Sequence, residues 1–121
     1  MTNKQFNTFC EAFKAATYIV QWGGSHVWKV GGKVFALGIF EKTESPAITF
    51  KTSPLNFEFL IHKDHYRPAP YLAPRGFKWI QQYGASSELD EELRYYIAQS
   101  YKLVSDGLTK KKQVELGVKL L

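Results

Sequence analysis

Two glycines between two runs of strand-forming residues constrain the fold of this chain more than any other feature. The run His26 to Val30 precedes Gly31-Gly32, and the run Lys33 to Leu37 follows it. This spacing predicts an antiparallel hairpin closed by a type I′ turn, in which both glycines adopt positive φ. Because side chains alternate along a strand, pairing Val30 with Lys33 predicts Trp28 opposite Phe35 and His26 opposite Leu37 on the core face.

Apolar residues at helical spacing predict a helix near the start of the chain and a short one in the middle. Thr2 followed by Gln5 is a capping-box pattern, which marks the start of a helix. Phenylalanines at positions 6, 9 and 13 then form one apolar stripe along this helix, and Cys10 lies in the same stripe. Ser53 followed by Pro54 is the preferred order at a helix start, so a short helix is expected from there to near residue 62.

The C-terminal third predicts one long helix and one short basic helix. Asp90 is expected to cap the long helix, which buries a stripe that ends near Val104 and stops at Gly107. Thr109 then begins a short helix that runs through Leu116. The acidic residues between positions 88 and 92 are explained by the positive end of the long helix, without any catalytic role.

The remaining segments predict further strands. Apolar and polar residues alternate over 47–51, which predicts a strand with Ile48 and Phe50 inward. Residues 66–72 contain two prolines that favour extended backbone, and residues 73–76 fit a type I turn. Residues 77–83 resemble another strand. Helices and strands do not alternate as βαβ units, so the expected fold is one α+β domain over residues 1–121, with a mainly antiparallel sheet of about five strands and helices packed on one face. The predicted core comprises Phe9, Phe13, Trp28, Phe35, Leu37, Phe50, Phe57, Ile97 and Val104.

Charge and cysteine content indicate a basic protein of a reducing compartment. The 121 residues carry a formal net charge of +5, which favours polyanionic partners. A single cysteine excludes an internal disulfide. The N-terminal residues do not resemble a secretory signal, and no stretch approaches the ~18 apolar residues of a membrane span, so we expect a cytoplasmic protein without a membrane partner.

The sequence contains no recognisable catalytic or metal-binding motif. His62 and His65 flank Asp64, but a closed metal site needs about four ligands, and Cys10 lies far away in the sequence. Gly24-Ser25-His26 is too short to be a nucleophile elbow. We therefore predict a protein that is not an enzyme and that uses no metal and no cofactor.

Basic residues interleaved with aromatic ones are the remaining surface signal. If Trp28, Phe50 and either Phe77 or Trp79 face the helices, Lys29, Lys51 and Lys78 point from the opposite face of the sheet. Tyr66 or Tyr71, if exposed, would stack on bases. The alternative is an ordinary solvated sheet face. The candidate phosphate-binding residues are Lys29, Lys33, Lys51, Arg67, Arg75 and Lys78.

Ordered motifs along most of the chain resemble the MmcQ/YjbR family. They are VWKVGGKVFA at 27–36, TFKTSPL at 49–55, WI at 79–80, and SYKLV at 100–104 followed by TKKK. The resemblance implies an antiparallel sheet with a frataxin-like architecture and a double-wing DNA-binding motif, whose wings here would be the Gly31-Gly32 hairpin and the region from Arg67 to Lys78. Iron binding of the frataxin type needs an acidic ridge, and the first helix has only Glu11, so that property is not carried over.

Two hypotheses about function follow, with a third kept open. The leading hypothesis is a non-enzymatic module that binds nucleic acid, DNA by the resemblance, through phosphate contacts. The alternative is a module that binds a protein or peptide through exposed aromatic and apolar surface. A small-molecule enzyme without a recognisable motif is the third, and a deep pocket containing His62 or His65 would favour it.

Overall fold

The computed structural model of the chain describes residues 1–40, 46–70 and 78–119. The helices are α1 (Asn3–Glu11), α2 (Pro54–Leu60), α3 (Asp90–Asp106) and α4 (Lys110–Leu116), and the 3₁₀ helix η2 (Ser87–Leu89) lies directly before α3. The strands are β1 (Thr17–Gln21), β2 (Ser25–Val30), β3 (Lys33–Ile39), β4 (Ala47–Lys51), β5 (Tyr66–Pro68) and β6 (Trp79–Tyr83).

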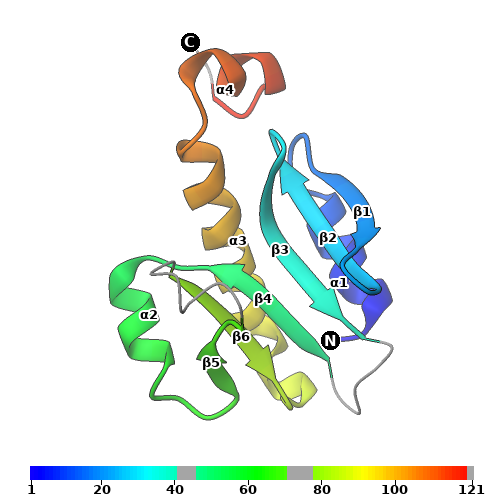
Figure 1. Cartoon of the computed structure of the whole chain (residues 1–121), viewed down its shortest axis with the longest axis vertical. Helices are drawn as coiled ribbons and strands as arrows, with labels where there is room; N and C mark the ends of the chain where they lie inside the picture. The colour runs from blue at the N-terminus through cyan, green and yellow to red at the C-terminus, as the bar shows by residue number, and fades with distance from the viewer. Residues whose placement is uncertain (41–45, 71–77, 120–121) are drawn as a thin grey trace.

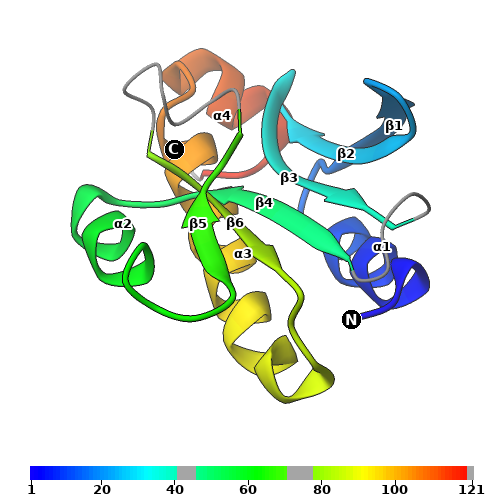
Figure 2. The ribbon, with the colours of Figure 1, turned by 60° about the horizontal axis from the view of Figure 1, so that its bottom comes forward.

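The strands form one antiparallel sheet in the order β1-β2-β3-β4-β6-β5. In Figures 1 and 2, α1 and α3 lie on the same side of this sheet, and α3 contacts β2, β3 and β4. The predicted α+β class and antiparallel sheet are confirmed. The sheet has six strands rather than about five, because β1 is a short apolar run that follows the first helix without a recognisable turn signal.

The glycine turn of the hairpin is confirmed, but its register differs from the expected one. Gly31 and Gly32 have φ of 58° and 80°, as a type I′ turn requires. The register shifts next to Trp28, which pairs with Ala36 instead of Phe35, while His26 pairs with Gly38. Phe35 is the extra residue of a β-bulge, so Phe35 and Ala36 are both buried in the core cluster. After the bulge Leu37 lies on the other face, half-buried, and its predicted place in the core was wrong.

Ser100 of α3 bridges β3 and β4 next to the last pair of their ladder, Ala36 with Phe50. Its hydroxyl donates to the carbonyl oxygen of Phe35 at 2.6 Å and accepts from the backbone N–H of Lys51 at 2.8 Å. The side chain is fully buried. A buried backbone group without a partner is costly, so one helix hydroxyl stabilises both strands at this point.

The core lies between the sheet and its helices. Among the predicted core residues Trp28, Phe35, Phe50, Ile97 and Val104 are buried, and Phe9, Phe13 and Phe57 are partly buried against the same cluster. Cys10 is fully buried in this cluster, as its position in the apolar stripe predicts, and burial raises the pKa of its thiol well above the usual range. It is therefore expected to be a poor nucleophile at neutral pH.

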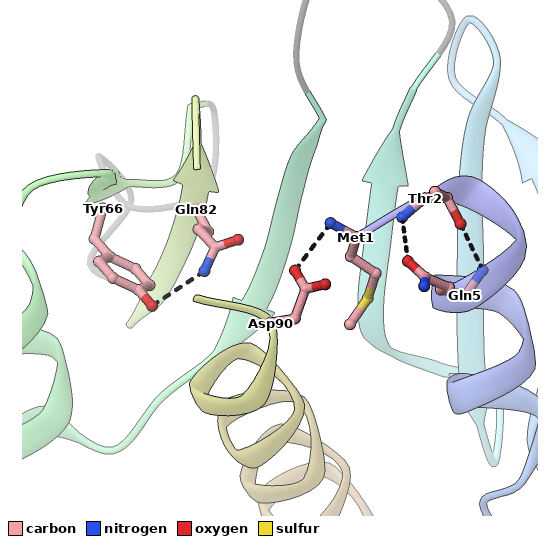
Figure 3. Close-up of polar contacts among 6 residues, drawn as sticks. All are labelled: Met1, Thr2, Gln5, Tyr66, Gln82 and Asp90. Carbon is pink, nitrogen blue, oxygen red and sulfur yellow. Dashed lines mark hydrogen bonds and ion pairs between the residues drawn. The ribbon is translucent and has the colours of Figure 1, made fainter. Parts of the chain in front are cut away.

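Most helix ends are where side-chain chemistry places them. The capping box between Thr2 and Gln5 is present (Figure 3), Ser53 caps α2, and Thr109 caps α4. Asp90 is an exception. It is the first residue of α3 and makes no cap; its carboxylate instead accepts a hydrogen bond from the N-terminal ammonium group of Met1 at 2.9 Å. No helix in the described part of the chain combines the length and hydropathy needed to cross a bilayer.

The two turn glycines allow a matched test of the hairpin. A Cβ added at Gly31 would lie 2.7 Å from the Leu108 side chain, whereas one at Gly32 would meet nothing within 4 Å. We expect Gly32→Ala to destabilise the fold by about 1 kcal/mol through positive φ alone. Gly31→Ala should destabilise it by a further ~1–3 kcal/mol through overpacking. Denaturant unfolding of both variants measures the difference, and equal losses would contradict the contact with Leu108.

Candidate nucleic-acid interface

Three of the predicted phosphate-binding residues gather at one end of the sheet. Lys29 pairs with Val34 near the hairpin turn, Lys33 pairs with Val30 at that turn, and Lys51 ends β4 opposite Trp79 of β6. Since β2 and β4 end where β3 begins, all three lie at the same end, which we call the hairpin end. Lys33 is exposed, and Lys29 and Lys51 are half-buried.

The side chains of Lys29 and Lys51 belong to the outer face, the sheet face that points away from α1 and α3. The middle of this face is not a solvated surface, because Val27, Thr49 and Gln81 are buried there. Trp79 lies beside Lys51 on the outer face and is half-buried. Its neighbour Ile80 pairs with Phe50 and points to the core, so Trp79 does not face the helices. A lysine with an adjacent indole is a combination that suits a phosphate and a stacked base.

Arg67 lies farther along the outer face and is held in place by its neighbours. Its Nε and Nη2 atoms donate to the Gln81 amide oxygen at 2.9 and 2.7 Å, and its guanidinium carbon lies 4.1 Å from the centroid of the Tyr83 ring. Gln81 donates in turn to the Thr49 hydroxyl at 3.4 Å. These contacts orient the exposed guanidinium before any ligand arrives, which reduces the entropy lost on binding an anion.

Two further candidates do not join this group. Lys78 has the same parity as the inward-facing Ile80, and its ammonium nitrogen lies 4.8 Å from the Phe57 ring centroid of α2. The expected row of Lys29, Lys51 and Lys78 on one sheet face is therefore wrong at Lys78. Arg75 lies outside the described residues.

Tyr66 does not meet the condition for base stacking, because it is buried. Its hydroxyl donates to the Glu92 carboxylate and accepts from the Gln82 amide at 3.1 Å, a contact drawn in Figure 3. Burial, followed by the neighbouring Glu92 carboxylate, raises the pKa of the Tyr66 phenol above its usual range, so the phenol stays neutral. Tyr71 lies outside the described residues.

Helix α4 adds lysines to the hairpin end. The sequence alone does not indicate that α4 lies there. A Cβ at Gly31 would meet the side chains of Leu108, just before α4, and Leu116, its last residue, so α4 lies against the hairpin turn. Figure 1 shows α4 beside the tip of the β2–β3 hairpin. Lys110, Lys111 and Lys112 of α4 are exposed. The acidic residues 88–92 lie at the start of α3, so charge of opposite sign gathers at the two ends of this helix.

The histidines and acidic residues of the described part of the chain do not gather into a metal site. The described residues hold no group of three or more His, Cys, Asp or Glu side chains able to bind a metal. A shallow hollow of about 330 Å³ between α1 and α3 is lined by Lys4, Gln5, Thr8, Phe9 and Arg94. His62 and His65 are exposed and do not line it.

Comparison with known proteins identifies the family. The family model described as YjbR matches residues 11–103. The chain belongs to the YjbR family. Two solved structures are similar to it in fold. A Deinococcus radiodurans protein with a DUF419 domain has 23% sequence identity and a TM-score of 0.79, and the match covers 96% of this chain and 88% of that one. A Pseudomonas syringae protein has 19% identity and a TM-score of 0.65, and the match covers 86% of this chain and 99% of that one. No curated protein matches the chain.

The Ser100-Tyr101 pair, part of the motif that pointed to the YjbR family, has a structural role here. Ser100 bridges β3 and β4, and Tyr101 stacks on Phe13 with ring centroids 4.7 Å apart. The Tyr101 hydroxyl donates to the carbonyl oxygen of Lys14 at 2.6 Å. These contacts tie α3 to the sheet and to the segment that follows α1. In this YjbR-family chain the matched region ends at residue 103, so the α4 lysines lie beyond it.

Proposed function

We propose that this YjbR-family chain is a non-enzymatic, cytoplasmic protein that binds DNA through phosphate contacts at its hairpin end. The observation that carries the proposal is the gathering of Lys29, Lys33 and Lys51 at one end of the sheet, beside the exposed lysines 110–112 of α4. Clustered cations attract polyanions more strongly than the same charges spread evenly.

Three features support nucleic acid over other polyanions. Trp79 beside Lys51 offers a partly exposed aromatic ring next to a cation. Arg67 on the same face presents an exposed guanidinium that is already oriented by Gln81 and Tyr83. The acidic start of α3 lies at the opposite end of that helix, which favours one orientation of the protein on a negatively charged backbone. All of these contacts go to phosphate or to base faces, so little sequence preference is expected.

A charge-neutralising triple variant tests the proposal. Changing Lys29, Lys33 and Lys51 to glutamine removes three cations from the hairpin end, and each phosphate contact contributes about 0.9 to the slope of log affinity against log salt on B-DNA. We expect the slope to flatten by about 2–3 for a random duplex. Fluorescence anisotropy titrations with duplex and single-stranded DNA at several salt concentrations measure it.

The matched control removes the same charge elsewhere. Lys4, Lys63 and Arg94 lie on α1, after α2 and on α3, so their triple change to glutamine leaves the hairpin end intact. This variant should change the slope by less than about 1. Equal slopes for both variants would show that attraction is diffuse and that the hairpin end is not a site. Absence of any salt-dependent binding by the unmodified protein would refute DNA binding altogether.

A further inference from the structure

Strand β1 forms an edge of the sheet that carries none of the usual protection against pairing with another strand. Among the strands that the structure describes, it pairs with β2 alone, and its Tyr18, Ile19 and Val20 are 44%, 47% and 51% exposed. Residues 15–28 contain no Asp, Glu, Lys or Arg, although 22% of the whole chain is charged. Natural proteins usually place a lysine, a proline or a bulge on such an edge. An exposed, uncharged edge strand is therefore suited to receive a further strand.

The edge is held in place from within the molecule. The Tyr18 hydroxyl lies 2.6 Å from Nδ1 of the buried His26, and its ring centroid lies 5.0 Å from that of Trp28. The Asn3 amide nitrogen lies 3.3 Å from Nε2 of His26, which connects this network to α1. These contacts order the strand without covering its outer backbone, so pairing requires little further loss of conformational entropy.

Trp22 adds a second unusual feature immediately after β1. It is 64% exposed and has a φ of 52°, a left-handed conformation that non-glycine residues rarely adopt. In the isolated molecule, both the solvent exposure of the indole and the left-handed backbone of Trp22 are unfavourable. Tryptophan is also among the residues most enriched at the energetic centres of interfaces. Both observations favour an interface that includes the turn after β1.

We propose that β1 pairs antiparallel with β1 of a second copy of this chain, with Ile19 opposite the partner's Ile19. A two-fold axis perpendicular to the sheet pairs identical residues at its centre. The five residues TYIVQ are then matched throughout: Thr17 faces the partner's Gln21, and Tyr18 faces the partner's Val20. Polar residues meet polar ones at both ends, apolar residues meet in the middle, and the helices of both copies stay on the same side of the joined sheet.

Charge favours this edge as the place where two copies meet. Each copy carries a net charge of +5, so most approaches between copies are repulsive. Pairing through β1 brings together the uncharged stretch 15–28 and sets no like charges opposite each other. The pairing involves only five residues a side, below the usual size of a stable interface, so a dimer with a dissociation constant on the order of 10–100 µM is expected.

Sedimentation equilibrium of the full chain between ~1 µM and 1 mM tests the association. We expect the apparent mass to rise toward that of a dimer across this range. The double variant Ile19→Lys with Val20→Lys should remain monomeric throughout. Leu55→Lys is the matched control, because Leu55 is 80% exposed on α2, which contacts β5 and β6 at the opposite end of the sheet from β1. This variant should dimerise as the unmodified protein does. A monomer at 1 mM for the unmodified protein would overturn the proposal.

Cysteine cross-linking tests the register independently of affinity. Directly opposite residues in an antiparallel pair have Cα atoms about 4.5–5.5 Å apart, within the range of a disulfide. Ile19→Cys should therefore form a covalent dimer under mild oxidation, whereas Thr17→Cys, opposite the partner's Gln21, should not. The buried Cys10 is common to both variants and cancels in the comparison. Equal cross-linking at the two positions, or none at position 19, would rule out this pairing.

Discussion

Replacing Ser100 by alanine is expected to lower the free energy of unfolding by about 2–4 kcal/mol. The hydroxyl donates to the carbonyl of Phe35 on β3 and accepts from the N–H of Lys51 on β4, just beyond the last pair of the β3–β4 ladder. Ser100 is fully buried, so both backbone groups would lose their partner without gaining water. Urea unfolding followed by far-UV circular dichroism measures the loss.

Ser105→Ala is the control for this prediction because Ser105 lies on the same helix and is also buried. Its hydroxyl donates to the carbonyl of Lys102, one turn earlier in α3, at 3.2 Å, and within the described residues it joins no two strands. Alanine also has the higher helix propensity, so the change should lower stability by less than about 1 kcal/mol. Equal losses for the two serines would mean that Ser100 contributes as an ordinary small core residue and not as a bridge between strands.

Replacing Phe35 by alanine is expected to destabilise the protein by about 3–5 kcal/mol, enough to unfold a marginal domain. Phe35 is fully buried and makes edge contacts with Phe13 and Tyr101, at ring-centroid distances of 5.6 and 5.2 Å. Its removal leaves a cavity between the bulge, the segment after α1 and α3. Thermal unfolding of the variant measures the loss as a lower melting temperature.

Phe59→Ala provides the comparison for the same chemical change at the surface. Phe59 is 56% exposed on α2, and the Lys63 ammonium nitrogen lies 5.4 Å from its ring centroid. Its loss should lower stability by no more than about 1 kcal/mol. If Phe35→Ala melted at the same temperature as Phe59→Ala, the bulge would not be the centre of the core that the structure indicates.

For the candidate site, the sequence predicts the sheet face of individual lysines better than their grouping in space. The face of Lys29 and Lys51 was predictable because side chains alternate along a strand and the neighbouring Trp28 and Phe50 face the core. Lys33 was placed at the turn by the two glycines. The predicted sheet face of Lys78 was wrong because the apolar residues of 77–83 do not alternate with polar ones. The pairing of Ile80 with the core residue Phe50 decides which residues of this strand face the core. The α4 lysines were treated as a separate tail, since nothing local indicates that Leu108 and Leu116 lie against Gly31.

The sequence by itself determined the features that depend on a few adjacent residues. The positive φ of Gly31 and Gly32, the caps at Thr2, Ser53 and Thr109, and the α+β class follow from local backbone and side-chain chemistry. Only the tertiary structure decided the bulge at Phe35, the edge position of β1, the partner of Asp90 and the meeting of α4 with the hairpin. Each of these depends on residues far apart in the chain, and their contact energies appear only once the chain has packed, so tertiary packing overrides the local pattern at these points.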